Sequence, residues 1–351
     1  MLRANTIYYP LIFKMPAGTS RGMLNQKESW FLVIEDSHKP GIFGLGECSL
    51  IPGLSPDDRS SYEAELGALC SQIEQHSIWN SNRGGLFPSI RFGLETALLD
   101  LNTGGNRLFS QNSFTSGHEG IPINGLVWMG KRGFMEKQVK EKIQAGFSCI
   151  KIKVGAIDFA EEIELLMNIR ANFTAADIEI RLDANGAFKP EDAMEKLKYL
   201  SDFSIHSIEQ PIRQGQTDQM AGLCKTSPIP IALDEELIGI MSVNDQRTLL
   251  KQIRPQYIIL KPSLLGGVTV ADTWIKLAEE LNIGWWATSA LESNIGLNAV
   301  AQWVFTKNNP MPQGLGTGQL YKNNFVSPLL ISNGGLFHNK NAGWDVSTLT
   351  P

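Results

Sequence analysis

The sequence predicts an α/β protein: a modified (β/α)7β TIM-like barrel preceded by an N-terminal α+β capping domain. Three observations predict this fold. Up to about residue 120, apolar strand segments come first and helical segments follow them. After Pro122, strand segments alternate with helical segments. In that second region, polar residues end successive strands at intervals of 25 to 30 positions, from Lys153 through Asp183 to Ser289. Such repeats are typical of a barrel that carries its chemistry at the carboxyl ends of its strands.

Composition and charge restrict the class of protein. The chain has 351 residues, 42% hydrophobic and 19% charged, as in an ordinary folded protein of one large or two smaller domains. A formal net charge of −5 argues against a nucleic-acid partner. Apolar runs such as 257–260 are far below the roughly 20 residues that cross a bilayer. No apolar signal region opens the sequence, and its four cysteines lack C-x-x-C spacing, so we expect a cytoplasmic protein with reduced thiols.

The first region begins with strands. Alternating and β-branched apolar residues predict strands over 7–13, 29–36 and 41–50, the last two joined as an antiparallel hairpin through a Pro-Gly link. Apolar residues at helical spacing then predict helices over 56–76 and 88–101. Strands followed by helices indicate a separate α+β unit.

The second region predicts a parallel sheet covered by helices. Its strand segments are largely apolar, which is typical of strands buried on both faces. No G-x-G-x-x-G fingerprint follows any strand, and about 200 residues of such repeats fit a barrel better than a doubly wound sheet. The predicted strands are 122–129, 148–154, 178–183, 206–210, 229–235, 257–262 and 283–290, and helices are predicted over 159–173, 190–200 and 270–281.

These patterns also predict domain boundaries. We expect residues 1–120 to form the capping domain and residues 121–317 to form the catalytic barrel. The C-terminal segment 318–351 is expected to join the capping domain. Its last part, 332–351, is rich in Gly and Asn and predicts irregular structure that folds back onto the first domain.

Three acidic residues end consecutive barrel strands: Asp183, Glu209 and Asp234. The carboxyl ends of barrel strands meet at one mouth, so these carboxylates are expected to converge there. Without a cation they would repel one another and be partly protonated. Oxygen ligands without His or Cys favour Mg²⁺, with Mn²⁺ as an alternative ion. Each acid alone is equally well explained as a helix cap or a solvated strand end, but three in succession favour a metal site.

Three lysines accompany the carboxylates. Lys151 and Lys153 are two apart on one strand, so their side chains share a face, and Lys261 ends a later strand. A lone K-x-K is usually a solvated edge strand, but flanking apolar residues such as Ile152 indicate burial on both sides. Crowding and burial are expected to lower a lysine pKa to roughly 7–8, which suits a general base.

This combination of groups favours one chemistry. A metal held by three carboxylates can bind a substrate carboxylate and stabilise the enediolate that forms when the α-proton leaves. One lysine removes the proton, and either lysine can deliver one later. The sequence therefore predicts proton abstraction α to a carboxylate, with a small-molecule carboxylic acid as substrate.

Seven motifs in order resemble the enolase superfamily, in its muconate lactonizing enzyme subgroup, over nearly the full length. The resemblance implies an enolase-type barrel in which Asp183, Glu209 and Asp234 bind Mg²⁺ while Lys153 and Lys261 flank the substrate. It also implies that Lys151 tunes Lys153 and that Asn185 hydrogen-bonds near the metal. The motifs are GLGECSLIPGLS (44–55), KIKVG (151–155), RLDANGAF (181–188), SIEQPI (207–212), ALDEE (232–236), LKPSLLGG (260–267) and TSALESNIGLNA (288–299).

Two absences narrow the reaction that the resemblance implies. The only histidines after Gly120 are His206 and His338, neither at a late barrel strand end, which argues against a mandelate-racemase type of site. The segment 311–324 has no acidic residue where dipeptide epimerases carry an Asp-x-Asp pair. The motif set most resembles the o-succinylbenzoate synthase family, which implies a lyase of menaquinone biosynthesis. An N-acylamino acid racemase, a muconate-type cycloisomerase and a metal-binding barrel without catalysis stay open as alternatives.

Other residues are expected to support the site. The segment 16–24 is predicted as a lid loop that places Ser20 or Arg21 near the succinyl tail, although an ordinary surface loop explains it equally well. Ser289 is expected either to donate to a substrate carboxylate or to cap its strand. Alternation along the strand is expected to turn Glu235 away from Asp234. The sequence leaves open whether the protein is a homo-oligomer.

Overall fold

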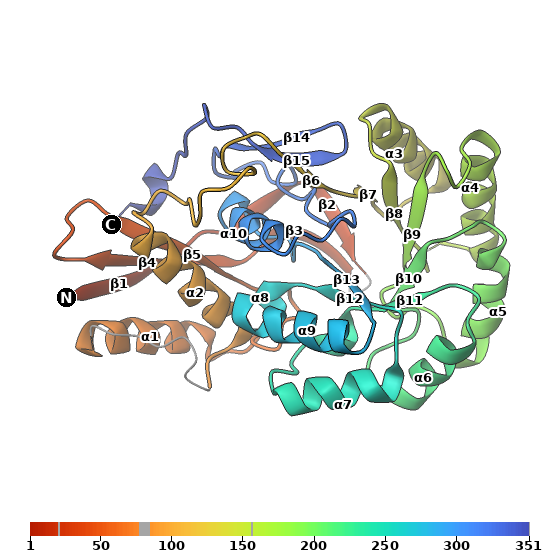
Figure 1. Ribbon diagram of the computed structural model, residues 1–351, viewed down its shortest axis with the longest axis horizontal. Coiled ribbons are helices and arrows are strands. Elements are labelled where there is room, and N and C mark those ends of the chain that lie inside the picture. Colours follow the sequence, from red (N-terminus) through yellow and green to blue (C-terminus); the bar gives the residue numbers. More distant parts are fainter. Residues whose placement is uncertain (20–21, 77–84, 156, 351) are drawn as a thin grey trace.

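The computed structural model describes residues 1–19, 22–76, 85–155 and 157–350 and shows two parts packed side by side (Figure 1). An antiparallel sheet with two helices holds the N-terminal residues, and a curved parallel sheet covered by helices holds the middle of the chain. This is the α/β architecture that the sequence predicts. Among the described residues, no helix is both long and apolar enough to cross a membrane.

The N-terminal sheet has the order β1-β4-β5 and is antiparallel throughout. Its strands are β1 (Leu2–Tyr8), β4 (Ser29–Asp36) and β5 (Phe43–Ser49), packed against helices α1 (Tyr62–His76) and α2 (Pro88–Asn102). The predicted hairpin and both predicted helices are confirmed, although α1 begins six residues later than expected.

The prediction of one strand over 7–13 is wrong. The chain leaves β1 at Tyr8 and resumes as β2 (Leu11–Thr19), with Pro10 between the two strands. Proline has no amide hydrogen to donate to a ladder, so a strand readily ends beside it. Strand β2 pairs antiparallel with β3 (Gly22–Lys27) instead of extending the first sheet.

The prediction of a lid loop over 16–24 is wrong for its described residues, because they lie in the β2–β3 pair. Ala17 pairs with Leu24, and the buried Leu11 and Phe13 pack against Tyr321. This apolar face fixes the hairpin on the rest of the molecule. Ser20 and Arg21, which were expected near the substrate tail, lie outside the described residues.

Seven parallel strands follow one another around the barrel in sequence order. Every predicted barrel strand is confirmed, with shorter bounds. The strands are β7 (Gly125–Val127), β8 (Cys149–Lys153), β9 (Glu179–Asp183), β10 (Ser207–Glu209), β11 (Ile231–Leu233), β12 (Tyr257–Leu260) and β13 (Gly284–Ala287).

A short eighth segment joins the two edges of this sheet. Gln313 bridges in parallel to Ile123, beside β7, and Gly314 bridges to Thr288, just past β13. The amide of Gly314 donates to Ala287 O at 2.8 Å, and the amide of Asn124 donates to Gln313 O at 2.9 Å. The parallel strands therefore form the predicted (β/α)7β barrel, whose last strand is reduced to a bridge.

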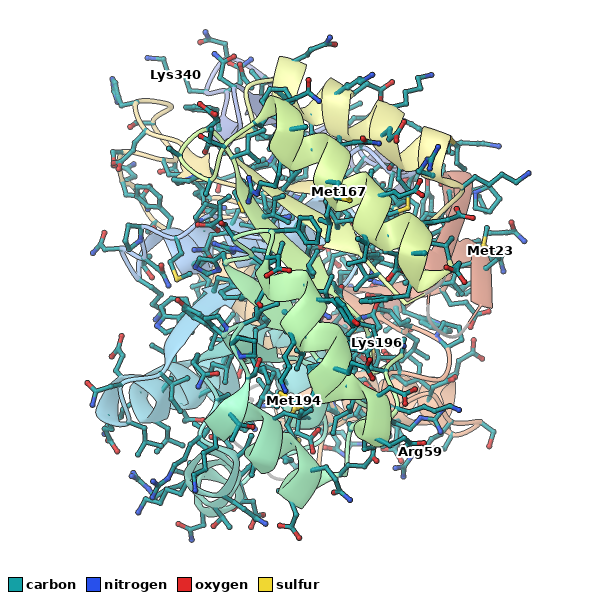
Figure 2. The ribbon with its side chains drawn as sticks, turned by 90° about the vertical axis from the view of Figure 1, so that its right-hand side faces the viewer. Met23, Arg59, Met167, Met194, Lys196 and Lys340 are labelled. Atoms are coloured by element: carbon teal, nitrogen blue, oxygen red, sulfur yellow. The ribbon has the colours of Figure 1, made fainter. Side chains whose placement is uncertain are left out.

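Helices cover the outer side of the barrel strands, as Figure 1 shows for α4 to α7. Figure 2 looks onto α4 and α5, where Lys196 lies with its Nζ 4.8 Å from the ring centre of Phe188. The predicted helices 159–173, 190–200 and 270–281 are confirmed. The helices are α3 (Arg132–Gln144), α4 (Phe159–Asn172), α5 (Pro190–Ser201), α6 (Thr217–Thr226), α7 (Val243–Ile253), α8 (Pro262–Leu265), α9 (Val268–Glu280) and α10 (Asn294–Phe305), with 3₁₀ turns η1 (Glu235–Leu237) and η2 (Ser347–Leu349).

Alternation along each barrel strand separates apolar from polar side chains. On β8, Ile150 and Ile152 belong to the large core between strands and helices, whereas Lys151 and Lys153 point to the other side. The same period places Trp286 of β13 beside Ile259, in a small cluster apart from that core. The barrel interior thus holds the charged residues that the sequence predicts for the site.

The prediction of irregular structure over 332–351 is wrong in part. Strands β14 (Leu329–Ser332) and β15 (Gly335–His338) form a hairpin that pairs with β6 (Ile121–Pro122). Beyond the hairpin, Leu349 packs with Phe31 of β4, as does Phe325 before it. The C-terminal segment therefore contacts both the start of the barrel and the N-terminal sheet.

Candidate active site

Strand register aligns the first three charged residues of the site. Lys153 lies opposite Asp183 across β8 and β9, and Asp183 lies opposite Glu209 across β9 and β10. Parallel strands in this register bring the carboxyl ends of all three strands to one level. The ammonium nitrogen of Lys153 lies 2.9 Å from Asp183 Oδ2.

Ion pairs join the remaining predicted groups. Lys151 Nζ lies 2.9 Å from Asp183 Oδ2 and also contacts Glu209 Oε2. Lys261, which directly follows β12, contacts Asp234 Oδ2. The five side chains that the sequence singles out as ligands and lysines, together with Lys151, therefore gather at one end of the barrel.

Burial and charge oppose each other in this cluster. Burial disfavours the ammonium form of Lys151, but the carboxylates of Asp183, Glu209 and Asp234 outweigh it and raise the pKa of Lys151. The pKa of Lys261 is raised in the same way, because its carboxylate neighbours outweigh its burial. The prediction that crowding lowers the lysine pKa is therefore wrong for Lys151, because it faces carboxylates more closely than it faces another cation.

The carboxyl groups respond in opposite directions. Burial raises the pKa of Asp183, but three nearby lysines outweigh that effect and hold the pKa below its usual range. Burial raises the pKa of Glu209, and the charge of Asp183 adds to this increase. Two acids side by side thus have different proton affinities, which is typical of a functional cluster.

The donor set fits a hard divalent cation. Asp183, Glu209 and Asp234 are at most 2% exposed. Within the described parts of the chain, Glu209 Oε1 has no hydrogen-bond donor, whereas Glu209 Oε2 contacts the ammonium group of Lys151. Oxygen lone pairs are therefore left for a cation, and carboxylates are the ligands that Mg²⁺ prefers. Among the described residues, no group of three Asp, Glu, His or Cys side chains is arranged closely enough to hold a metal ion as it stands. Lysine ammonium groups contact the carboxylates instead.

Asn185 and Glu235 extend the cluster. Asn185 accepts a hydrogen bond from Lys153 at 2.5 Å and donates one to Glu235 Oε1 at 3.1 Å. The expectation that alternation turns Glu235 away is wrong, because β11 ends at Leu233 and the 3₁₀ turn η1 begins at Glu235. Burial raises the pKa of Glu235 to about 7, and the charge of Asp234 adds to the effect.

A cavity opens beside these groups. Lys151, Lys153, Asp183 and Lys261 line one side of it. The rest of its wall comes from the loop after β5, from β7 and the residues beside it, from the turns after β9 and β11, from the loop after β13 and from the eighth barrel segment. These residues are Ile51, Leu54, Asn124, Leu126, Trp128, Asn185, Glu235, Thr288, Ser289, Ala290, Leu291, Gly314, Gly316 and Thr317.

Known proteins resemble this chain in sequence and in fold. The family described as enolase C-terminal domain-like matches residues 135–347. An o-succinylbenzoate synthase from Desulfotalea psychrophila is 48% identical over 92% of this chain and 95% of its own length. The chain belongs to the o-succinylbenzoate synthase family of the enolase superfamily. A second synthase of this family, from Bacillus subtilis, is 26% identical over 83% of this chain and 78% of its own length.

Solved structures show the same relationship. The crystal structure of MenC from Desulfotalea psychrophila LSv54 has a TM-score of 0.85 and 43% identity, covering 96% of this chain and 99% of that one. A muconate lactonizing enzyme from Pseudomonas fluorescens has a TM-score of 0.80 at 20% identity, covering 99% of this chain and 98% of that one. At that identity the second likeness shows the shared fold alone.

The sequence analysis missed two polar side chains of the candidate active site. Asn124 Oδ1 and Thr288 Oγ1 are buried, line the cavity and have no hydrogen-bond donor or acceptor within the described chain. Thr288 directly follows β13, so the strand-end rule that found the acids would have found it. Asn124 directly precedes β7, so that rule does not cover it. Neutral polar side chains are common at strand ends, so such a residue alone does not indicate a functional site.

Ser289 lies where the sequence places it, at the cavity wall. Its hydroxyl donates to Glu292 Oε2 at 2.5 Å and accepts from Thr317 Oγ1 at 2.8 Å. The amide of Leu291 also donates to it at 3.1 Å. The single proton of the Ser289 hydroxyl is therefore directed to Glu292 in this structure. Its predicted role as a donor to substrate stays a prediction.

Proposed function

We propose that this protein is an o-succinylbenzoate synthase. It catalyses the syn dehydration of 2-succinyl-6-hydroxy-2,4-cyclohexadiene-1-carboxylate to o-succinylbenzoate, in menaquinone biosynthesis. The observation that carries the proposal is the meeting of Lys153, Lys261 and Asp183 at one cavity, next to two further buried carboxylates. The 48% identical synthase supports the choice of reaction.

Three carboxylates would hold the cofactor that this reaction needs. Asp183, Glu209 and Asp234 are the proposed Mg²⁺ ligands, and Mn²⁺ has the same preference for oxygen donors. A bound divalent cation supplies positive charge that stabilises the enediolate formed when the α-proton of the substrate carboxylate leaves. The three acids are buried at one end of the barrel, and Glu209 Oε1 has no hydrogen-bond donor among the described residues, which supports this assignment.

Lys153 is the proposed base. In its neutral form, Nζ takes the proton from the carbon next to the substrate carboxylate, and the electron pair moves into the enediolate. The same nitrogen then returns that proton to the departing hydroxyl group as its C–O bond breaks, so that water leaves and the ring becomes aromatic. Asp183 and Asn185 hold Nζ at 2.9 and 2.5 Å, which fixes the amine on one face of the substrate.

Lys261 is the proposed stabilising cation on the opposite side. Its pairing with Asp234 and the raised pKa that the carboxylates give it keep the side chain charged. A cation against the face of the ring attracts it by about 0.5–2 kcal/mol. Lys151 is buried between Asp183 and Glu209, and its positive charge partly neutralises these two carboxylates next to Lys153.

The experiment that tests the proposal is a direct assay of the purified protein. We expect formation of o-succinylbenzoate from the cyclohexadiene substrate, which is lost with EDTA and restored by Mg²⁺. Racemisation of N-acylamino acids, which would use Lys153 and Lys261 symmetrically, is the alternative to measure in parallel. Racemisation without any dehydration would overturn the proposed reaction and leave the fold and the site unaffected.

We further propose that residues 1–120 and 318–351 act as one capping unit over the barrel of 121–317. Packing of Leu349 and Phe325 against Phe31 supports this division. A cytoplasmic location is also part of the proposal, because all four cysteines are free thiols, as expected in a reducing compartment. A homo-oligomer stays a prediction without an observation behind it.

A further inference from the structure

One residue of the cavity wall has an unfavourable backbone conformation. Leu291, in the loop after β13, has a φ of +63°, in the left-handed region that residues other than Gly, Asn and Asp rarely adopt. Ala290 and Leu291 both line the cavity that holds Lys153 and Lys261. Strained residues persist only where their surroundings hold them, and they concentrate at functional sites. What holds Leu291 therefore bears on how substrate is bound.

Two side chains from distant parts of the sequence bind the carbonyl of Leu291. Lys27 Nζ donates to it at 2.9 Å, and Tyr321 Oη donates to it at 2.7 Å. The amide of Leu291 donates in turn to Ser289 Oγ. Both sides of the strained residue are thus fixed by hydrogen bonds.

Lys27 is built into this position. It ends β3, is 1% exposed, and donates to Ser49 Oγ at 2.7 Å and Ala290 O at 2.8 Å as well as to Leu291 O. An ammonium group has three protons, and three acceptors use all of them. An exposed lysine would make no such set. The side chain therefore joins the β2–β3 hairpin to two consecutive carbonyl groups of the cavity wall.

Two buried carboxylates compensate the buried charge. Glu292 accepts from Ser263 Oγ at 2.5 Å, from Ser289 Oγ and from the amide of Ala290 at 2.8 Å. Glu47 of β5 accepts from the amide and the hydroxyl of Ser293. Both acids are at most 1% exposed. The network therefore ties the N-terminal strands to the loop between β13 and α10 at successive residues.

Apolar contacts follow the same line. Ala290 forms a buried cluster with Ile51 and Leu264, and Leu54 and Leu291 pack against it. Ile51 and Leu54 come from the loop after β5 and line the cavity too. The loop after β13, which Lys27 holds, and the loop after β5 therefore form one apolar wall of the cavity.

We propose that Lys27 is a positioning residue for substrate binding, which rests on the proposed synthase function. It contacts no substrate itself. From the capping unit it holds Leu291 in the left-handed conformation, and so it sets the apolar wall against which the organic part of the substrate lies.

The test compares KM with kcat in single and double variants. In Lys27→Met we expect KM for the cyclohexadiene substrate to rise about tenfold. The value of kcat should stay within about threefold of the wild type, because Lys153 and Lys261 are unchanged. Lys14→Met, which removes an exposed lysine from the paired strand β2, is the matched control and should leave KM unchanged. An equal rise in KM in the control would overturn the proposal, because loss of positive charge alone would then explain it.

A double-mutant cycle identifies Leu291 as the residue through which Lys27 acts. Leu291→Gly removes both the strain and the wall side chain, so it should raise KM by itself. If Lys27 acts through Leu291, adding Lys27→Met to Leu291→Gly should raise KM no further. A double variant in which the two increases multiply would overturn the proposal.

Two further measurements keep the test decisive. If Lys27→Met does not fold, Tyr321→Phe takes its place, because it removes only the second hydrogen-bond donor to the Leu291 carbonyl. This variant should raise KM about threefold. An unchanged KM in Tyr321→Phe would overturn the proposal. Amide hydrogen exchange of residues 290–292 should be faster in Lys27→Met, or in Tyr321→Phe if that variant replaces it, than in the wild type. This readout needs no turnover. A wild type without synthase activity would refute the proposed function, whereas unchanged exchange would refute the role of Lys27.

Discussion

Lys153 Nζ donates to Asn185 Oδ1 at 2.5 Å, across two neighbouring barrel strands. Asn185 has a φ of +44°, so the turn after β9 leaves the strand sharply and presents the amide toward the lysine. The same turn holds Asp183, whose Oδ1 accepts from the amide of Asn185 at 3.1 Å. The Asp-Ala-Asn-Gly turn therefore ends strand β9 and also holds the amine of Lys153, the proposed base, by hydrogen bonds.

Replacing Lys153 by Ala should nearly abolish synthase turnover. A general base contributes about 10²–10⁴-fold to a rate. Lys153 Nζ donates hydrogen bonds to Asp183 Oδ2 and Asn185 Oδ1 of this turn, which positions it for that role. The measurement is kcat with saturating Mg²⁺, accompanied by thermal unfolding to show that the fold is kept. Activity within tenfold of the wild type would remove Lys153 from the base role.

Magnesium should raise the unfolding temperature through the three carboxylates. A ligand that binds only the folded state stabilises it by about 2.7 kcal/mol at 100 times its dissociation constant. We expect Mg²⁺ to raise Tm by several degrees in the wild type and to have little effect in Glu209→Gln, because the amide loses the ligand charge. The measurement is thermal unfolding with MgCl2 and with EDTA.

A matched control uses Glu191, an exposed acid on helix α5. Glu191→Gln should keep the full Mg²⁺-dependent rise in Tm. An equal rise in Glu209→Gln and in the wild type would refute Glu209 as a ligand without reference to catalysis.

His338 should make the protein sensitive to mild acid. Its ring is 5% exposed beside Phe114, neither ring nitrogen has a hydrogen-bond partner among the described residues, and burial lowers its pKa. The unfolded chain, with its histidine pKa near 6.5, then binds the proton more readily than the folded chain. Stability is therefore complete above about pH 6.5 and falls below it, by up to about 1.4 kcal/mol per pH unit.

His338→Leu should remove this contribution. The free energy of unfolding, measured with urea at pH 7 and at pH 5, should change less in His338→Leu than in the wild type. Burial also lowers the pKa of His206, so a smaller dependence on pH is expected to remain. The exposed His38 is the control, and His38→Gln should behave as the wild type does. Identical pH dependence in His338→Leu and the wild type would contradict the assignment.

The convergence of the charged residues at the strand ends could be predicted, because it depends only on the geometry of a strand and of its neighbours in a parallel sheet. A strand of period two puts Lys151 and Lys153 on one side, and a parallel sheet aligns the ends of neighbouring strands. Asp183 and Glu209 therefore meet whatever the loops do. The same rule failed at Glu235, since a 3₁₀ turn begins there and ends the alternation.

The network around Lys27 could not be predicted from the sequence. Its contacts join Lys27 to Leu291, 264 positions away, and Glu47 to Ser293, 246 positions away. No periodicity connects such residues, because their meeting depends on how the capping strands pack on the barrel. An isolated lysine at a strand end is usually exposed, and only the packed structure shows that Lys27 is buried and saturated with acceptors.

The eighth barrel segment offers a prediction about two glycines in Gly-Leu-Gly, both at the cavity wall. A Cβ on Gly314 would lie 2.9 Å from Thr288 Cβ and even closer to its hydroxyl, whereas a Cβ on Gly316 would meet nothing nearer than Asn124 O at 3.6 Å. Gly314→Ala should therefore destabilise the protein by about 1–3 kcal/mol and lower kcat/KM by moving Thr288, as overpacking does. Gly316→Ala should change stability by no more than about 0.5 kcal/mol. Urea unfolding of both variants checks this, and equal stability would mean that Thr288 yields without cost.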